Sequence, residues 1–208
     1  MTEALTIRHA ETEWSQNGRH TGRTDIPLTE EGREYARRLA SRLAGRTFAL
    51  VLTSPLSRVR ETCELAGLGD RAQPRDDLME WDYGDYEGLT TPQIREQRPD
   101  WNLWRDGCPG GESAADVGGR VDRVIAEVRR VDGDAALVAH GHVLRVLGAR
   151  WVELPPQDGA RFALSTGALC TLGYERETPV FWHWNESVEA PQSQPGDSAA
   201  AQAGMVGS

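Results

Sequence analysis

The chain has 208 residues with 23 basic and 32 acidic side chains, which give a formal charge of −9, and every basic side chain is an arginine. The acidic balance argues against a nucleic-acid binder, whose affinity comes from a cationic surface facing the phosphates. Without lysine, the sequence also excludes Schiff-base enzymes, lysine-anchored pyridoxal phosphate enzymes and P-loop enzymes, because each needs an ammonium group.

The composition changes near residue 187, where arginine and aromatic residues end and Ala, Gln, Ser, Pro and Gly dominate. We therefore expect one domain over residues 1–186 and a disordered tail over residues 187–208. The longest apolar run, residues 48–52, is far shorter than the roughly 18 residues of a membrane span. No basic or apolar leader precedes the first Arg-His pair, so we expect a cytoplasmic protein. Its three cysteines are far apart and are expected to be reduced.

Short apolar runs alternate with amphipathic stretches, which predicts βα units in a three-layer α/β/α sandwich with a mostly parallel central sheet. We expect strands over residues 4–7, 48–52, 135–139, 168–174 and 180–184. We expect helices from residue 29 past residue 43, over residues 54–66, 92–99 and 113–128, and from residue 140 to 151. Residues 15–28 are expected to form a loop, and residues 78–89, which show no clean period, an irregular segment.

Three chemically distinctive segments follow predicted strands. Arg8-His9 follows the first strand, residues 54–60 follow the second, and His140-Gly141-His142 follow the strand over residues 135–139. Ligands in open α/β sheets bind at the carboxyl ends of the strands, so these segments are expected to converge on one crevice. Two arginine forks, from Arg8 and either Arg58 or Arg60, together with His140, suit the oxygens of a phosphoryl group. This spacing predicts a phosphate site.

Within this site, His9 is the candidate nucleophile, because no G-x-S-x-G motif and no reactive-cysteine signature competes with it. The pair His140 and His142 also allows a metal site, but no further ligand at fixed spacing accompanies it, so no metal is expected. His20 is expected at the mouth of the crevice, and His183 on the surface or in packing.

Residues 80–88 concentrate four acidic and three aromatic side chains. This segment is either a solvated acidic loop or the source of a carboxylate that transfers protons at the phosphate site. The pattern alone leaves both interpretations open.

Five ordered blocks resemble the histidine phosphatase superfamily, the phosphoglycerate-mutase-like fold, over nearly all of residues 4–184. The blocks are residues 8–14, residues 21–29, residues 54–58 with Thr62, residues 78–80 with 83–84 and 87–88, and residues 140–141. Residues 80–88, 104–108 and 111–113 are similar to the acid-phosphatase and sugar-phosphatase branch, which includes sedoheptulose bisphosphatase. Two positions depart from the family pattern: Ala10 replaces the usual glycine after the nucleophile, and Ser15 replaces an asparagine found in many members.

The resemblance implies that His9 is the phosphorylated nucleophile, that Arg8, Arg58 and His140 complete the phosphate pocket, and that Glu80 is the proton donor. Arg60 is then expected to be external. The expected substrate contacts beyond this set are Ser15, His20, Thr21, Gly22, Tyr83, Arg105 and Gly141. The expected activity is hydrolysis of a small phosphorylated metabolite, such as a sugar phosphate, without a cofactor. The alternatives are a phosphoglycerate mutase and a non-catalytic protein that binds a phosphorylated ligand; the oligomeric state stays open.

Overall fold

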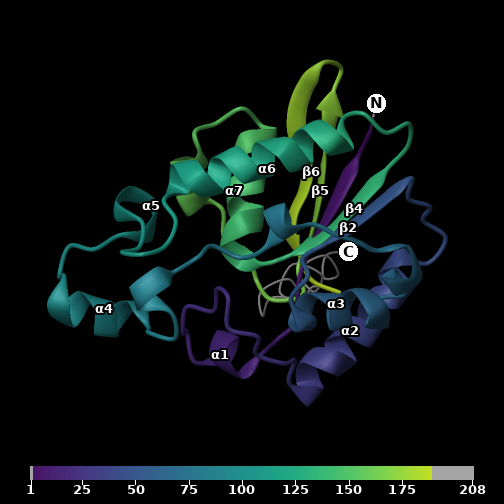
Figure 1. The fold of residues 1–208 in the computed structure, drawn as a ribbon. Helices are drawn as coiled ribbons and strands as arrows, with labels where there is room; N and C mark the ends of the chain where they lie inside the picture. The colour runs from purple at the N-terminus through teal and green to yellow at the C-terminus, as the bar shows by residue number, and fades with distance from the viewer. Residues whose placement is uncertain (1, 189–208) are drawn as a thin grey trace, which may run out of the picture.

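A six-stranded sheet in the order β3-β2-β4-β1-β5-β6 is the middle layer of the computed structural model, which describes residues 2–188 (Figure 1). The strands are β1 Ala4–Arg8, β2 Leu50–Thr53, β3 Gln73–Pro74, β4 Ala135–Ala139, β5 Leu169–Glu175 and β6 Thr178–Glu186. Strands β3, β2, β4 and β1 run parallel, whereas β5 and β6 are antiparallel additions. This arrangement confirms the predicted α/β class and the mostly parallel sheet.

Two helix pairs cover the two faces of the sheet (Figure 1). The helices are α2 Glu30–Leu43 and α3 Ser57–Leu65 on one face, and α6 Ala114–Val128 and α7 Gly141–Trp151 on the other. Successive side chains of β4 alternate between these layers: Leu137 packs with α6 and α7, and Val138 packs with α2 and α3. Both faces of β4 are therefore buried, which explains its uninterrupted apolar sequence.

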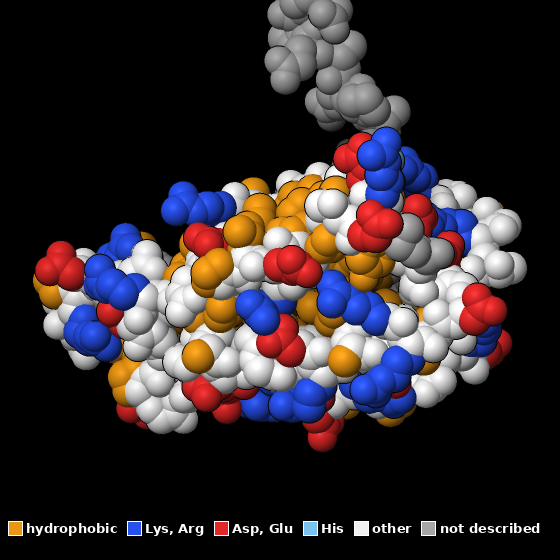
Figure 2. Space-filling model, turned by 90° about the horizontal axis from the view of Figure 1, so that it is seen from above, with side chains coloured by type: hydrophobic (Ala, Val, Ile, Leu, Met, Phe, Trp, Pro, Cys, Tyr) orange, Lys and Arg blue, Asp and Glu red, His pale blue; other side chains and the backbone are white. Residues whose placement is uncertain are grey.

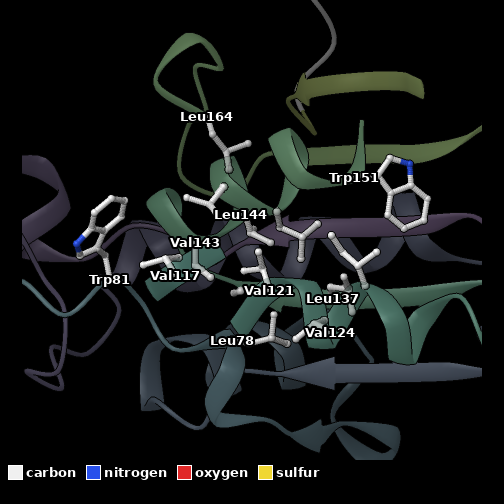
Figure 3. Packing of buried hydrophobic residues seen from close by; sticks show 14 of the residues in the cluster. Leu78, Trp81, Val117, Val121, Val124, Leu137, Val143, Leu144, Trp151 and Leu164 are labelled. Atoms are coloured by element: carbon white, nitrogen blue, oxygen red, sulfur yellow. The ribbon is translucent and has the colours of Figure 1, made fainter. Parts of the chain in front are cut away.

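Helix α6 begins where its sequence predicts. Ser113 and Asp116 form a reciprocal capping box that satisfies the first N–H groups. The stripe that includes Val117, Val121 and Val124 is buried against α7 and the sheet (Figure 3). Each such side chain contributes roughly 1.5–3 kcal/mol of transfer free energy on burial, so this layer holds α7 firmly against the carboxyl end of β4.

Short elements gather beyond the carboxyl ends of the parallel strands (Figure 1). They are α1 Glu13–Gln16, α4 Thr91–Gln97, α5 Leu103–Asp106 and the 3₁₀ turns Asp76–Leu78 and Gly84–Tyr86; further 3₁₀ turns are Gly69–Arg71 and Pro156–Arg161. Helix α4 and the irregular character of residues 78–89 match the prediction. Helices α1 and α5 were not predicted, because a single turn is too short to show helical periodicity.

Three predicted boundaries are wrong. Helix α3 begins at Ser57 rather than at residue 54, because the Ser54 hydroxyl pairs with Nε2 of His140 (2.8 Å) and Asp25 accepts the first helical N–H, from Ser57 (2.9 Å). Strand β2 starts two residues later than expected. Strand β6 already begins at Thr178, because the turn lies at residues 176–177, where Arg176 adopts a φ of 57°.

The predicted tail, residues 187–208, lies outside the described residues apart from its first two. Val188 donates its backbone N–H to the Tyr35 hydroxyl (3.1 Å) and packs against the buried apolar side chains between helices α2 and α3 and the sheet. In the described part of the chain, no helix is long and apolar enough to cross a membrane. Figure 2 shows arginine and acidic side chains interspersed over one face of the molecule.

Candidate active site

The neighbouring parallel strands β2, β4 and β1 bring three polar residues to one edge of the sheet. His9 donates its backbone N–H to Ala139 (2.9 Å), and Ser54 donates its own to Val138 (3.0 Å), so the ladder continues past the strand ends. His140 follows β4 directly. The rings of His9 and His140 meet edge to face with centroids 5.2 Å apart. The structure therefore brings together the segments whose convergence the strand order predicts.

His9 is held in one orientation and one tautomer. Its Nδ1 lies 2.7 Å from the carbonyl oxygen of Ala10, which can only accept, so Nδ1 carries the proton and Nε2 keeps its lone pair. Burial, reinforced by the charges of Arg58 and Arg8, lowers the pKa of His9 well below 6.5. The ring is therefore neutral at pH 7, the form in which an imidazole is nucleophilic.

A threonine hydroxyl fixes the turn that follows His9. Thr62 Oγ1 accepts the backbone N–H of Ala10 (3.1 Å) and donates to the carbonyl of Arg58 (2.7 Å). The replacement at Ala10 fits this turn, because its side chain is completely buried and leaves the N–H free to donate. Thr62 thus couples the turn after His9 to α3, which carries Arg58.

Two arginines and a histidine present buried nitrogen atoms without partners at the site. Arg8 Nε, Arg58 Nε and His140 Nδ1 are buried and have no hydrogen-bond partner among residues 2–188. Burial lowers the pKa of both arginines. Burial and the charge of Arg58 lower the pKa of His140 well below 6.5. Buried donors without partners are costly, so a ligand that supplies several oxygens would satisfy these groups together.

Glu80 joins the site through the start of α7. Its Oε1 accepts the backbone N–H groups of Trp81 and Val143 (2.9 Å each), and its Oε2 accepts that of His142 (3.0 Å). The side chain is nearly buried and lines the same cavity as His9. Of the acids in residues 80–88, Glu80 is the one that lines this cavity; Asp82 pairs with Arg23 instead.

The cavity includes most of the predicted substrate contacts. Those that line it are Arg8, Ser15, His20, Thr21, Tyr83 and Gly141. Arg58 and His140 are fully buried beneath the lining, and Gly22 lies behind it, where its carbonyl accepts from Arg58 Nη2 (3.0 Å). Arg60 is exposed, as expected from the resemblance.

Arg105 does not belong to this cavity. The one-turn helix α5 places it on the surface, where its guanidinium pairs with Asp106 and bonds to the carbonyl of Asp100. It lines a separate, open depression with Asp158 and Arg161. The expectation that Arg105 contacts the substrate therefore has no geometric support, because its neighbouring acid already occupies the guanidinium.

A second group of cavity residues was not among the expected substrate contacts, although His142 lies in a segment that was expected at the crevice. These are Thr12, Gly18, Arg19, His142, Arg145 and Leu164. His142 and Arg145 are three residues apart on α7, a spacing that places both on one helix face and could have indicated them. Arg145 stacks 4.7 Å above the Trp104 ring and donates to the carbonyls of Gly159 and Ala160 (3.0 Å each).

The alternative of a metal site at His140 and His142 has no support from the geometry. His140 pairs through Nε2 with Ser54, whereas Nδ1 of His142 lies 2.6 Å from the Tyr83 hydroxyl, so the two rings serve different partners. Among the described residues, no group of three or more His, Cys, Asp or Glu side chains could hold a metal ion.

Comparison with known proteins places this site in a family. The profile of the histidine phosphatase superfamily (branch 1) matches residues 5–187. An acid phosphatase of Mycobacterium tuberculosis is 46% identical over 176 residues, which cover 82% of this chain and 86% of that protein. The sedoheptulose 1,7-bisphosphatase of Saccharomyces cerevisiae is 38% identical over 186 residues, covering 74% and 68%.

Two further likenesses bear on fold and activity. A 2,3-bisphosphoglycerate-dependent phosphoglycerate mutase of Brucella anthropi is 36% identical over 180 residues, covering 77% of this chain and 86% of that protein. The solved structure of the open reading frame Rv3214 from M. tuberculosis superposes with a TM-score of 0.85 at 41% identity, covering 90% of this chain and 99% of that chain.

The chain belongs to the histidine phosphatase superfamily, as its motif blocks predict. It is an enzyme of the phosphatase class.

Proposed function

We propose that this protein hydrolyses a small phosphate monoester, of the sugar-phosphate class, through a phosphohistidine formed on Nε2 of His9. The observation that carries the proposal is the hydrogen bond from Nδ1 of His9 to the Ala10 carbonyl, which leaves Nε2 unprotonated at the cavity. The acid phosphatase and bisphosphatase relatives support the same reaction class.

In the first step, Nε2 attacks phosphorus in line while Arg8, Arg58 and His140 bind the equatorial oxygens. The P–N bond forms as the P–O bond to the leaving group breaks, and the leaving oxygen takes a proton from Glu80. The two guanidinium charges match the two negative charges of a phosphate monoester. Catalysis then depends on positioning and on fixed charge.

In the second step, water attacks the phosphohistidine and returns His9 to its neutral form. Glu80, now ionised, accepts the proton of that water. Inorganic phosphate leaves the three donors that held it throughout.

His9→Ala tests the proposal directly. Turnover of every phosphate ester should be abolished, because no other neutral imidazole or nucleophile occupies this position. Wild-type enzyme quenched during turnover of ³²P-labelled substrate should carry acid-labile, base-stable phosphate, and the variant should carry none. Metal-dependent hydrolysis that survives in His9→Ala would refute the proposal, and a chelator control identifies it.

The alternative activity is that of a phosphoglycerate mutase, which one of the relatives carries. A mutase must exclude water while the phosphoryl group remains on histidine, and this chain has no lysine to bind a carboxylate-bearing substrate and only residues 89–111 to form a lid. Incubation with 3-phosphoglycerate and a bisphosphoglycerate primer separates the two activities. Isomerisation faster than phosphate release would reassign the enzyme as a mutase.

A further inference from the structure

The turn over residues 21–24 lies between a buried cation and a carboxylate. On one side, Arg58 donates to the carbonyls of Thr21 (3.1 Å), Gly22 (3.0 Å) and Thr24 (2.9 Å). On the other side, Glu87 accepts the N–H of Gly22 at both carboxylate oxygens (2.9 and 3.0 Å) and the N–H of Thr24 (3.0 Å). The same short turn therefore contacts both charges through its backbone.

The three carbonyls determine where the Arg58 guanidinium lies. Its Nη1 and Nη2 both donate to the turn, whereas Nε is the buried atom that has no partner in residues 2–188. The side chain is fully buried, and the described residues place no carboxylate oxygen within ion-pair distance of it. The direction of the Arg58 Nε–H bond thus depends on the position of the turn. This N–H is the group of Arg58 that is free to donate to a phosphate oxygen.

Glu87 supports the turn from the opposite side. The peptide group that joins Thr21 to Gly22 donates its N–H to the carboxylate and accepts from the guanidinium at its carbonyl, so its dipole aligns between the two charges. Hydrogen bonds in such a chain polarise and strengthen one another. The contact is also tight, since a Cβ on Gly22 would lie 2.6 Å from Oε2 of Glu87 and 2.7 Å from the carbonyl of Trp81.

Other contacts hold the ends of this segment without Glu87. His20 donates its N–H to the carbonyl of Leu89 (2.9 Å), and Gly88 donates to the carbonyl of His20 (2.8 Å). Asp25 accepts from the backbone and hydroxyl of Ser57 (2.9 and 2.7 Å). The Glu87 carboxylate is therefore not required to attach the loop to the domain, and its contacts are confined to the part of the turn that orients Arg58.

We propose that Glu87 is a positioning residue that holds Arg58 in its phosphate-binding orientation through the turn at residues 21–24. This inference rests on the proposed function, in which Arg58 binds the transferring phosphoryl group. Glu87 touches neither substrate nor reacting atoms. Its effect on catalysis passes through Arg58 and disappears when the guanidinium is removed.

A double-mutant cycle with Glu87→Gln and Arg58→Ala tests the proposal. The amide keeps one acceptor oxygen but presents an NH₂ group to the N–H donors of the turn. In the wild-type background we expect kcat/KM for p-nitrophenyl phosphate to fall about 10-fold, and the Kd of orthophosphate to rise by a similar factor, the size of one lost charge-assisted hydrogen bond. In the Arg58→Ala background, the same substitution should change kcat/KM less than about twofold.

Asp85→Asn is the matched control, because it removes one negative charge from the exposed surface of the 3₁₀ turn Gly84–Tyr86, just before Glu87, and should change neither constant. Equal losses from Glu87→Gln in both backgrounds, or no loss in either, would overturn the inference. If Glu87→Gln unfolds below the assay temperature, Glu87→Asp enters the same cycle. If the wild-type enzyme quenched during turnover carries no phosphate, the proposed function itself is refuted.

Discussion

At the residue scale, the position of Glu80 determines what its carboxylate can do. Backbone N–H groups of Trp81, His142 and Val143 fix both oxygens at the first turn of α7. A leaving oxygen that takes a proton from Glu80 must approach this one place in the cavity. In the proposed mechanism, the role of Glu80 therefore depends on the leaving group more than on the phosphoryl group.

Glu80→Gln should slow phosphoenzyme formation according to the basicity of the leaving oxygen. A sugar alkoxide needs a proton in the transition state, and general acid catalysis is typically worth about 10²- to 10⁴-fold. Nitrophenolate leaves without a proton, so the loss with p-nitrophenyl phosphate should be clearly smaller. The pre-steady-state rate of phosphoenzyme formation with each ester is the measurement, because it excludes the hydrolytic step, in which we propose that Glu80 accepts the proton of water.

Equal losses with the two esters would mean that Glu80 orients the phosphate instead of protonating the leaving oxygen. The neighbouring acids are poor substitutes in the structure: Asp82 pairs with Arg23, and Glu87 accepts the N–H groups of the turn at residues 21–24. Asp82→Asn provides the comparison, and it should show no dependence on the leaving group.

At the element scale, α7 joins the two halves of the site. It begins directly after His140, its first turn binds Glu80, and Arg8 lies against Gly141. A Cβ on Gly141 would stand 3.2 Å from Cζ and Nε of Arg8, which is closer than about nine in ten real Cβ contacts. A glycine at this position allows the guanidinium to lie across the helix start.

Gly141→Ala should separate stability from activity. Alanine favours helix over glycine by roughly 0.5–1 kcal/mol, which offsets the contact with Arg8, so we expect the free energy of unfolding to change little. Displacement of Arg8 should lower kcat/KM about 10-fold, as expected for weakening one charge-assisted bond to the phosphate. Urea unfolding and steady-state kinetics measure the two quantities.

Gly119→Ala on α6 is the matched control, because nothing lies within 4 Å of its added Cβ. It should stabilise the protein by about 0.5–1 kcal/mol and leave kcat/KM unchanged. An unchanged kcat/KM in Gly141→Ala would show that Arg8 adjusts without loss of phosphate binding.

Some elements and site residues can be predicted from local sequence patterns, and others cannot. Strand β4 and helix α6 follow from local patterns, an uninterrupted apolar run and a capping box before an apolar stripe. His9, Arg58, Glu80 and His140 could be proposed because each lies in a recognisable motif block. The contacts of Glu87 with Gly22 and Thr24 could not, because they join segments about 65 residues apart through backbone N–H groups, which carry no sequence signal.

At the scale of the whole molecule, four histidines lie at one end of the fold, with His9 and His140 buried and His20 and His142 partly buried, and this burial links activity to stability. Desolvation lowers the pKa of His20 to about 4 and lowers the pKa values of His9, His140 and His142 well below 6.5. A neutral His9 at acidic pH keeps the nucleophile available there. The same burial has a thermodynamic cost, because each ring regains its ordinary pKa when the chain unfolds.

The pH dependence of unfolding should reveal this cost. Below pH 6.5 the unfolded chain binds protons that the native state does not, so the free energy of unfolding falls as the pH falls, and these groups contribute no pH dependence above 6.5. Each histidine adds a slope of at most about 1.4 kcal/mol per pH unit, and the four together roughly 5 kcal/mol per pH unit. Urea unfolding in phosphate-free buffer between pH 7.5 and 5.5 measures the slope, and His20→Gln should reduce it by about a quarter. A free energy of unfolding that is constant over this range would show that these rings take up protons in the native state.

Because His9 itself stays neutral, we expect activity at acidic pH to be limited by unfolding and not by protonation of His9. The acid limb of the activity profile should therefore move to lower pH when a stabilising substitution such as Gly119→Ala is introduced far from the site.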